Sequence, residues 1–120
     1  MEIIRISDVK GEEINDSRLF VGSVNFKNLI DEKVSERYWV FSADFEPGHR
    51  SVVHTHNTEQ LLYFTAGKGI VGTESEEHEV TAGTLIFIPA GQRHYHGATG
   101  TTSCSHLAIL LEGPGNLEEE

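Results

Sequence analysis

The chain has 120 residues, the size of one domain, and can bury about 65% of its unfolded surface in a core. Nineteen Asp and Glu against nine Lys and Arg give a formal charge of −10, so we expect it to bind neither nucleic acid nor an anionic membrane surface. The single cysteine, Cys104, excludes an internal disulfide. No signal-peptide-like or bilayer-spanning apolar run is present, and a cytoplasmic protein is expected.

Short apolar–polar alternations separated by turn residues predict an all-β sandwich or barrel. In the first half we expect an edge strand at 3–6, a strand at 20–26, and a loop or single helical turn at 28–36. A strong strand follows at 37–45, and after the turn at 46–48 a strand returns over 51–56. Side chains two apart share a face of a strand, so one face of the strong strand should carry Trp39, Phe41, Ala43 and Phe45.

The second half continues the pattern. A strand at 60–65 is expected to end in a hairpin at 66–69, with its partner at 70–73 and an acidic connection at 73–79. The apolar run 85–88 predicts a strand that is buried on both sides or lies under a dimer contact. Further strands are expected around 93–97 and at 105–111. One domain should therefore span residues 1–112, followed by a flexible acidic tail at 113–120.

Three histidines and a glutamine are spaced as the ligands of one metal ion would be. His54 and His56 are two apart, so one strand would present both imidazoles to the same side. Gln60 follows, and His94 could approach from a distant strand. Two histidines on a solvent-exposed face are the simpler alternative, and Glu59 competes with Gln60 as the fourth ligand. Strand alternation favours Gln60, because the two side chains point to opposite faces.

These residues belong to two longer motifs. Gly48, His54, His56 and Gly67 match the first motif of the cupin superfamily, except that Gln60 occupies its acidic position. The second motif is matched by Gly83, Pro89, Gly91 and His94, with Ala98 in place of its Asn, and fifteen residues separate the motifs. The chain therefore resembles a small single-domain cupin, and the resemblance implies an all-β double-stranded β-helix, the cupin jelly-roll barrel.

Within that superfamily the sequence is similar to a subgroup that carries Gln at this position. The subgroup includes manganese-dependent cupin hydroxynitrile lyases and cupins associated with carboxymuconolactone decarboxylases. The resemblance implies one divalent transition metal per chain, with manganese or iron favoured and nickel or zinc also compatible. Its ligands would be His54, His56, Gln60 and His94. A neutral amide in place of a carboxylate would leave the ion more Lewis acidic.

Two other histidines could take part in catalysis. His96 shares a face with His94 if the segment is extended. It could be a metal ligand, a general acid/base or a hydrogen-bond partner of a ligand. His106 is either a hydrogen-bonded core residue or a catalytic base. We expect a metalloenzyme acting on a small carbonyl or hydroxy compound, as a hydroxynitrile lyase does. An iron-dependent dioxygenase and a non-catalytic cupin that binds a small molecule are the alternatives. A homodimer is expected through the 85–88 run and the last strand.

Overall fold

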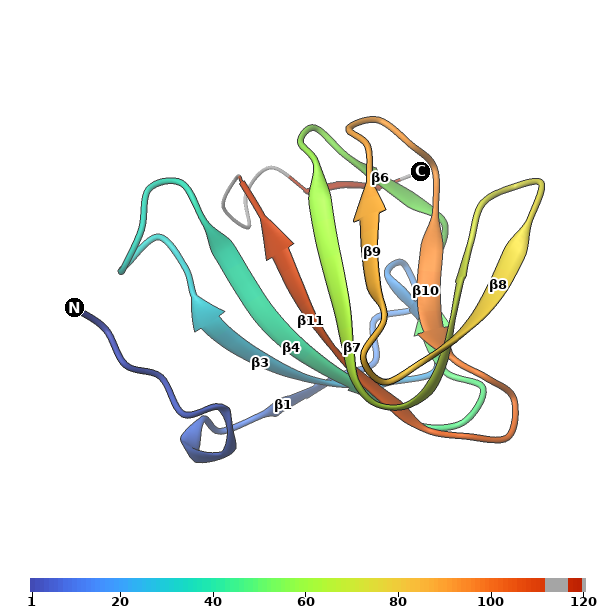
Figure 1. The fold of residues 1–120 in the computed structure, drawn as a ribbon, viewed down its shortest axis with the longest axis horizontal. Coiled ribbons are helices and arrows are strands. Elements are labelled where there is room, and N and C mark those ends of the chain that lie inside the picture. The colour runs from blue at the N-terminus through green and yellow to red at the C-terminus, as the bar shows by residue number, and fades with distance from the viewer. Residues whose placement is uncertain (112–116, 120) are drawn as a thin grey trace.

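The computed structural model describes residues 1–111 and the backbone of residues 117–119, and it forms a jelly roll built almost entirely of β-strands (Figure 1). The elements in chain order are the 3-10 helix η1 (Ile6–Asp8) and the strands β1 (Glu12–Ile14), β2 (Phe20–Val21), β3 (Val24–Ile30), β4 (Trp39–Phe45), β5 (Arg50–Ser51), β6 (His54–His56), β7 (Gln60–Gly72), β8 (Glu77–Thr81), β9 (Leu85–Ile88), β10 (Tyr95–Ala98), β11 (Cys104–Leu110) and β12 (Leu117–Glu119).

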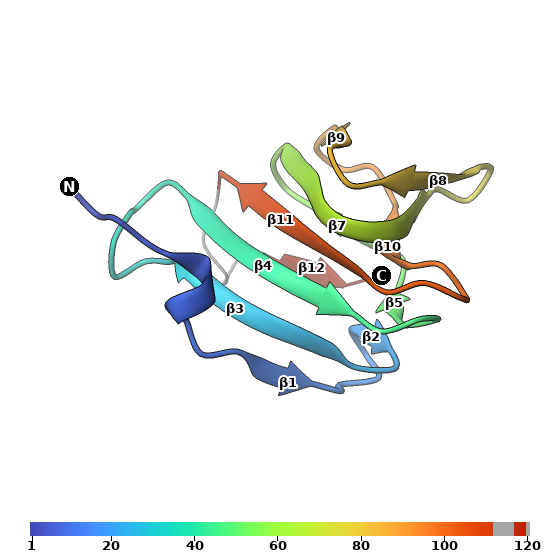
Figure 2. The same ribbon diagram turned by 60° about the horizontal axis from the view of Figure 1, so that its bottom comes forward.

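The long strand β7 joins the two layers of the roll. Its first half pairs with β11 and β9, and its second half pairs with β10 and β8, all antiparallel (Figure 2). The first layer therefore runs β1-β3-β4-β11-β7-β9, and the second contains β2, β5, β10 and β8. Gly67 lies where β7 passes between the layers, at a φ of 75°. A Cβ there would lie 2.0 Å from the Ser103 carbonyl oxygen, so only glycine fits.

The core lies between the layers and is supplied by alternate residues of the central strands. Trp39, Phe41, Ala43 and Phe45 of β4 are all buried, as their spacing predicts. On β11 the buried positions are likewise every second residue, from Cys104 to Leu110. This regular alternation leaves one face of each strand pointing into the roll, which is where functional side chains can be enclosed.

Several predicted elements are wrong in detail. Residues 3–6 form no strand; the first regular element is η1, and the first strand is β1. The predicted strand at 20–26 is two strands, broken at Gly22, which has a φ of 82°. No hairpin forms at 66–69, because β7 continues to Gly72 and turns back at 73–76 into β8. The glycines that suggested a turn instead admit close neighbours: a Cβ at Gly69 would lie 2.2 Å from the Phe64 ring and 2.7 Å from the Gly97 carbonyl oxygen.

The apolar run 85–88 is a strand, as predicted, but it is not buried on both sides in the single chain. Ile86 and Ile88 point inward, whereas Leu85 and Phe87 are 62% and 55% exposed. The expected tail at 113–120 falls mostly outside the described residues, although the backbone of β12 pairs with β6. Among the described residues no helix is long and apolar enough to cross a membrane.

Candidate metal centre

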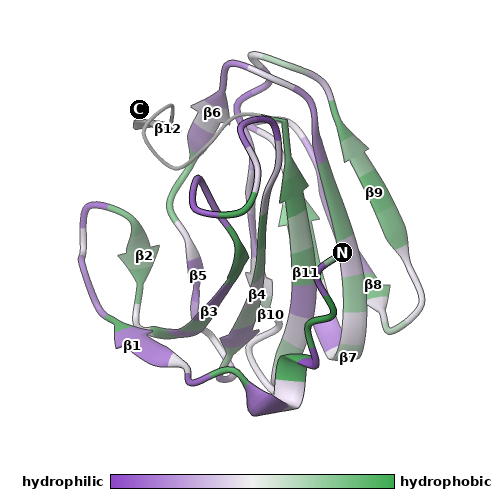
Figure 3. Ribbon diagram, turned by 90° about the vertical axis from the view of Figure 1, so that its left-hand side faces the viewer, coloured by the Kyte–Doolittle hydropathy of each residue, from purple (hydrophilic) through white to green (hydrophobic). Residues whose placement is uncertain are grey.

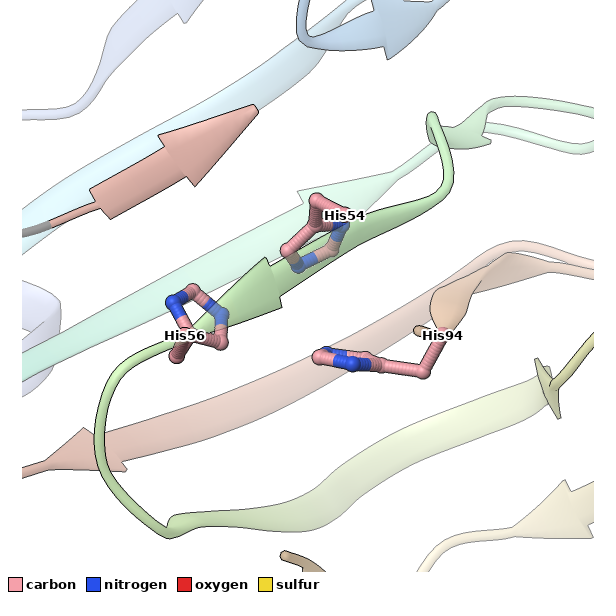
Figure 4. Close-up of side chains that lie close together, drawn as sticks. All are labelled: His54, His56 and His94. Atoms are coloured by element: carbon pink, nitrogen blue, oxygen red, sulfur yellow. The ribbon is translucent and has the colours of Figure 1, made fainter. Parts of the chain in front are cut away.

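β6 and the segment before β10 bring three imidazoles together (Figure 4). His54 and His56 are both buried on β6, and the backbone of His54 exchanges two hydrogen bonds with His94, at 2.9 and 3.0 Å. The pairing sets His94 directly beside His54. One ring nitrogen from each of the three residues lies within 4.8 Å of the others, so the three nitrogens are close enough to share one metal ion.

Hydrogen bonds to the backbone orient two of these rings. Nδ1 of His54 lies 2.7 Å from the Val52 carbonyl oxygen, and Nδ1 of His94 lies 2.8 Å from that of Gln92. Donation from Nδ1–H fixes the tautomer and leaves the Nε2 lone pair free. His56 Nε2 is buried and has no hydrogen-bond partner among the described residues. Such a buried, unpaired acceptor is what a bound cation would satisfy.

Gln60, the first residue of β7, completes the group. Its side chain is buried, and Oε1 lies 3.2 Å from His94 Nε2. With the His94 proton on Nδ1, both of these atoms are acceptors, and a shared cation would relieve their contact. Glu59 is exposed. The geometry therefore places the amide of Gln60, and not the carboxylate of Glu59, beside the three imidazoles.

Burial keeps the three imidazoles neutral. Loss of hydration lowers the pKa of His54, and it lowers the pKa of His56 to about 3 with a further contribution from the charges of His54 and His94. The pKa of His94 falls to about 4 for the same main reason. Three neutral imidazoles and a neutral amide oxygen form a donor set that fits a divalent transition metal such as manganese, iron, nickel or zinc.

A second pair of histidines lies next to this group. His96 Nδ1 and His106 Nε2 are 3.1 Å apart, and both side chains are buried. The His96 ring lies 5.3 Å from the His54 ring, and Ser51 Oγ accepts a hydrogen bond from the His96 backbone N–H at 3.0 Å. Burial lowers the pKa of both imidazoles, that of His106 to about 4. One ring donates to the other, so the pair can accept, pass and return a proton.

All of these groups except His94 line one cavity of about 320 Å³. Its remaining wall is mostly apolar and includes Trp39 and Phe41. Asn28 is also in the wall, where its Oδ1 accepts a hydrogen bond from Trp39 Nε1 at 2.7 Å. Asn28, Ser51 and Phe20 also line the cavity, although no motif in the sequence singled them out. Strand periodicity could have placed Ser51 and Phe20 on inner faces, but it could not show that the cavity reaches them.

Comparison with known proteins agrees with this arrangement. The cupin domain family matches residues 41–110, which include all six of these histidine and glutamine positions. An (R)-mandelonitrile lyase from Granulicella tundricola is 36% identical over 111 residues, covering 91% of this chain and 83% of that protein. A dimethylsulfoniopropionate lyase from Ruegeria pomeroyi is 32% identical over 75 residues, but the match covers only 61% of this chain and 49% of that protein.

Solved structures share the architecture. A cupin-like protein from Thermotoga maritima superposes with a TM-score of 0.80 at 29% identity, over 93% of this chain and 82% of the other. An acetylacetone dioxygenase from Acinetobacter johnsonii has a TM-score of 0.76 at 19% identity, over 92% and 74%, and this likeness concerns the fold alone. This chain belongs to the cupin superfamily, as shown by the matched family, the jelly roll and the histidines of the two motifs.

Proposed function

We propose that this cupin is a metal-dependent lyase that cleaves or forms small hydroxy compounds of the cyanohydrin type. The observation that carries the proposal is that one largely apolar cavity is lined both by His54 and His56 of the three-histidine group and by the buried His96–His106 pair. The similarity to an (R)-mandelonitrile lyase over most of both chains supports the same reaction class.

The residues that would hold the metal are His54, His56, Gln60 and His94. A divalent ion there would supply Lewis acidity toward a substrate oxygen, and the neutral amide of Gln60 would preserve that acidity better than a carboxylate. Manganese or iron suits three imidazoles and an amide oxygen, although a purified sample can also carry nickel or zinc, which bind such sites tightly.

The chain's own acid/base group is the His96–His106 pair. When a cyanohydrin is cleaved, the bond between the carbinol carbon and the nitrile carbon breaks, and the cyanide leaves with the bonding electrons. The hydroxyl proton passes to the imidazole pair and is then returned to the cyanide. Because burial holds the pKa of His106 at about 4, its imidazole is neutral at neutral pH and so has a free lone pair for a proton. The largely apolar wall of the cavity lowers the local dielectric constant and so strengthens these polar contacts.

The test is metal analysis of tag-free protein together with product analysis of the manganese- and iron-loaded forms. The substrates are aromatic and aliphatic cyanohydrins, with diketones under an oxygen electrode. Aldehyde and cyanide release is the expected result. Oxygen consumption with iron but not with manganese would favour a dioxygenase instead. Stabilisation by small molecules without turnover would indicate a binding protein, and either outcome would overturn the proposal.

A further inference from the structure

One polar side chain, that of Asn28, lies at the edge of the cavity farthest from the metal-binding group. β1 pairs with β3 only at residues 24–26, so residues 27–30 have no strand on their outer side among the described residues (Figure 1). Figure 3 faces this edge of the sheet. Asn28 is exposed there and also lines the cavity. Three strand spacings of about 4.8 Å separate β3 from β7, which puts Asn28 about 14 Å from Gln60 across the sheet.

The hydrogen bonds of Asn28 determine how its amide is turned. Its Oδ1 accepts a hydrogen bond from Trp39 Nε1 at 2.7 Å, and its Nδ2 donates to Asp31 Oδ2 at 3.0 Å. An indole N–H can only donate and an ionised carboxylate can only accept, so the amide cannot be reversed. The second N–H of the amide has no hydrogen-bond partner in the described part of the chain, and it is available to a ligand.

The same amide positions the aromatic wall of the cavity. Trp39 is 6% exposed, and its ring centroid lies 4.7 Å from that of Phe41 and 6.3 Å from that of Phe26. Without Asn28, the indole N–H would lose its acceptor, and an unpaired buried donor is unfavourable. Asn28 therefore holds the indole in place as a flat apolar surface beside the ligand space.

We propose that Asn28 determines which ligands the cavity selects, by positioning Trp39 through its Oδ1 and by donating its second N–H to the ligand. The selected ligand has a flat apolar body, which lies against the aromatic wall, and a hydrogen-bond acceptor at the end remote from the histidines. The proposal rests on the proposed function in placing the reacting end of the ligand at the histidines. A polar group that expects an acceptor discriminates against a ligand that lacks one, because the group is then left unpaired.

The probes are two pairs of compounds of nearly equal size. Mandelonitriles that carry a para-methoxy or a para-ethyl group are used for turnover, and the benzyl alcohols with the same two groups are used for binding. Only the methoxy group contains an acceptor. Trp39 is the only tryptophan of the chain, so its fluorescence reports binding of the alcohols without any reaction. The wild type is expected to favour the methoxy compound about 5-fold in both kcat/KM and affinity.

Two variants separate the two roles of the amide. Asn28→Leu should abolish the methoxy preference, raise KM more than it lowers kcat, and shift the emission of Trp39, because the indole loses its acceptor. The exchange of Asn28→Asp with Asp31→Asn keeps the net charge and an acceptor for Trp39, and it reverses the hydrogen bond between positions 28 and 31. It leaves no N–H at position 28, so the preference should disappear while the emission stays that of the wild type.

Asn25→Leu is the matched control, because Asn25 is exposed on the same strand and does not line this cavity. It should keep both the preference and the emission, and circular dichroism checks that each variant is folded. Loss of the preference in both the folded Asn28→Leu variant and the exchanged protein would support the proposal. A preference that survives in either one, an unchanged emission in Asn28→Leu, or a wild type that binds neither alcohol or binds both equally would overturn it.

The two readouts distinguish this proposal from the proposed function. Selective binding of the methoxy alcohol without turnover of either nitrile would overturn the lyase function and support the role of Asn28. Turnover of both nitriles at equal kcat/KM, with equal binding of both alcohols, would support the lyase function and overturn the role of Asn28.

Discussion

The inner and outer faces of the first-layer strands carry different kinds of side chain. On β11, the inward residue His106 is fully buried and hydrogen-bonds His96, while its neighbour Leu107 is half-buried on the outside. On β7, inward Gln60 reaches the histidine group, while the next residue, Leu61, is half-buried on the outside. A period of two lets one strand place polar groups in an enclosed cavity and apolar groups on an exterior surface. The inward polar groups His106 and Gln60 lie among buried apolar residues of the same strands, such as Leu62 and Ala108, and buried polar side chains in such surroundings are candidates for function.

The largest effect on the inner face is expected from removing one of the proposed metal ligands. His56→Ala should lose at least nine-tenths of the bound metal and lower kcat/KM about 1,000-fold, because the centre keeps only three of its four donors. Elemental analysis and steady-state kinetics measure the two effects. His78→Ala is the control, since His78 is exposed and its Nε2 lies 3.4 Å from a carboxylate oxygen of Glu76, outside the cavity. Full metal occupancy in His56→Ala would remove this residue from the centre.

The second change tests the imidazole pair while sparing the ligands. His106→Gln should keep its metal and its fold but lower kcat about 100-fold or more, because His96 loses its proton-transfer partner. The pH–rate profile should also change shape, which a purely structural role would not produce. Ser105→Ala, on the outer face of the same strand, should leave the rate unchanged. An unaltered rate in His106→Gln would exclude it from the reaction.

A smaller effect is expected from exchanging the amide for a carboxylate. Gln60→Glu should bind metal at least as tightly as the wild type yet lower kcat about 10-fold, because the added negative charge reduces the Lewis acidity of the ion. Titration of metal-free protein with manganese and turnover measurements separate affinity from rate. Glu59→Gln alters the exposed neighbour and should change neither. A Gln60→Glu enzyme as fast as the wild type would show that ligand charge does not limit the reaction.

The smallest effect concerns stability against acid. The pKa of His106 is about 4 in the folded protein against an ordinary value of 6.5, so below pH 6.5 the unfolded chain binds a proton that the folded protein does not. The stability present above pH 6.5 is therefore lost as the pH falls toward 4, by up to about 3 kcal/mol for this residue.

Urea unfolding of chelator-treated protein at pH 7.5 and 4.5 measures this loss. His106→Gln should lose less stability between the two pH values than the wild type, since Gln cannot take up the proton. His78→Gln, in which an exposed histidine is replaced, should match the wild type. An identical acid-induced loss in wild type and His106→Gln would show that this imidazole is not the buried base described here.

Some of the architecture could be predicted from local pattern alone, and some could not. The strand at Trp39–Phe45 could be predicted because large apolar side chains recur at every second position over seven residues, which is typical of a strand. The prediction of a hairpin at 66–69 was wrong, because glycine occurs both in turns and in strands that other backbone segments approach closely. In β7 it is the approach of Ser103 and Gly97 that requires Gly67 and Gly69. The exposure of Leu85 and Phe87 could not be predicted either, since an apolar run does not tell which surface covers it.

The sequence by itself determined the fold family and the group of candidate ligands, because side-chain alternation and fixed motif spacing are local properties of the chain. It left open whether Gln60 or Glu59 lies beside the histidines, and where the His106 imidazole lies relative to them. Only the tertiary structure decided these points of placement. It sets Gln60 3.2 Å from His94 and His106 3.1 Å from His96. Those distances depend on strand pairings between residues as many as 50 positions apart, and long-range register is a property of the packed sheets rather than of any local run of residues.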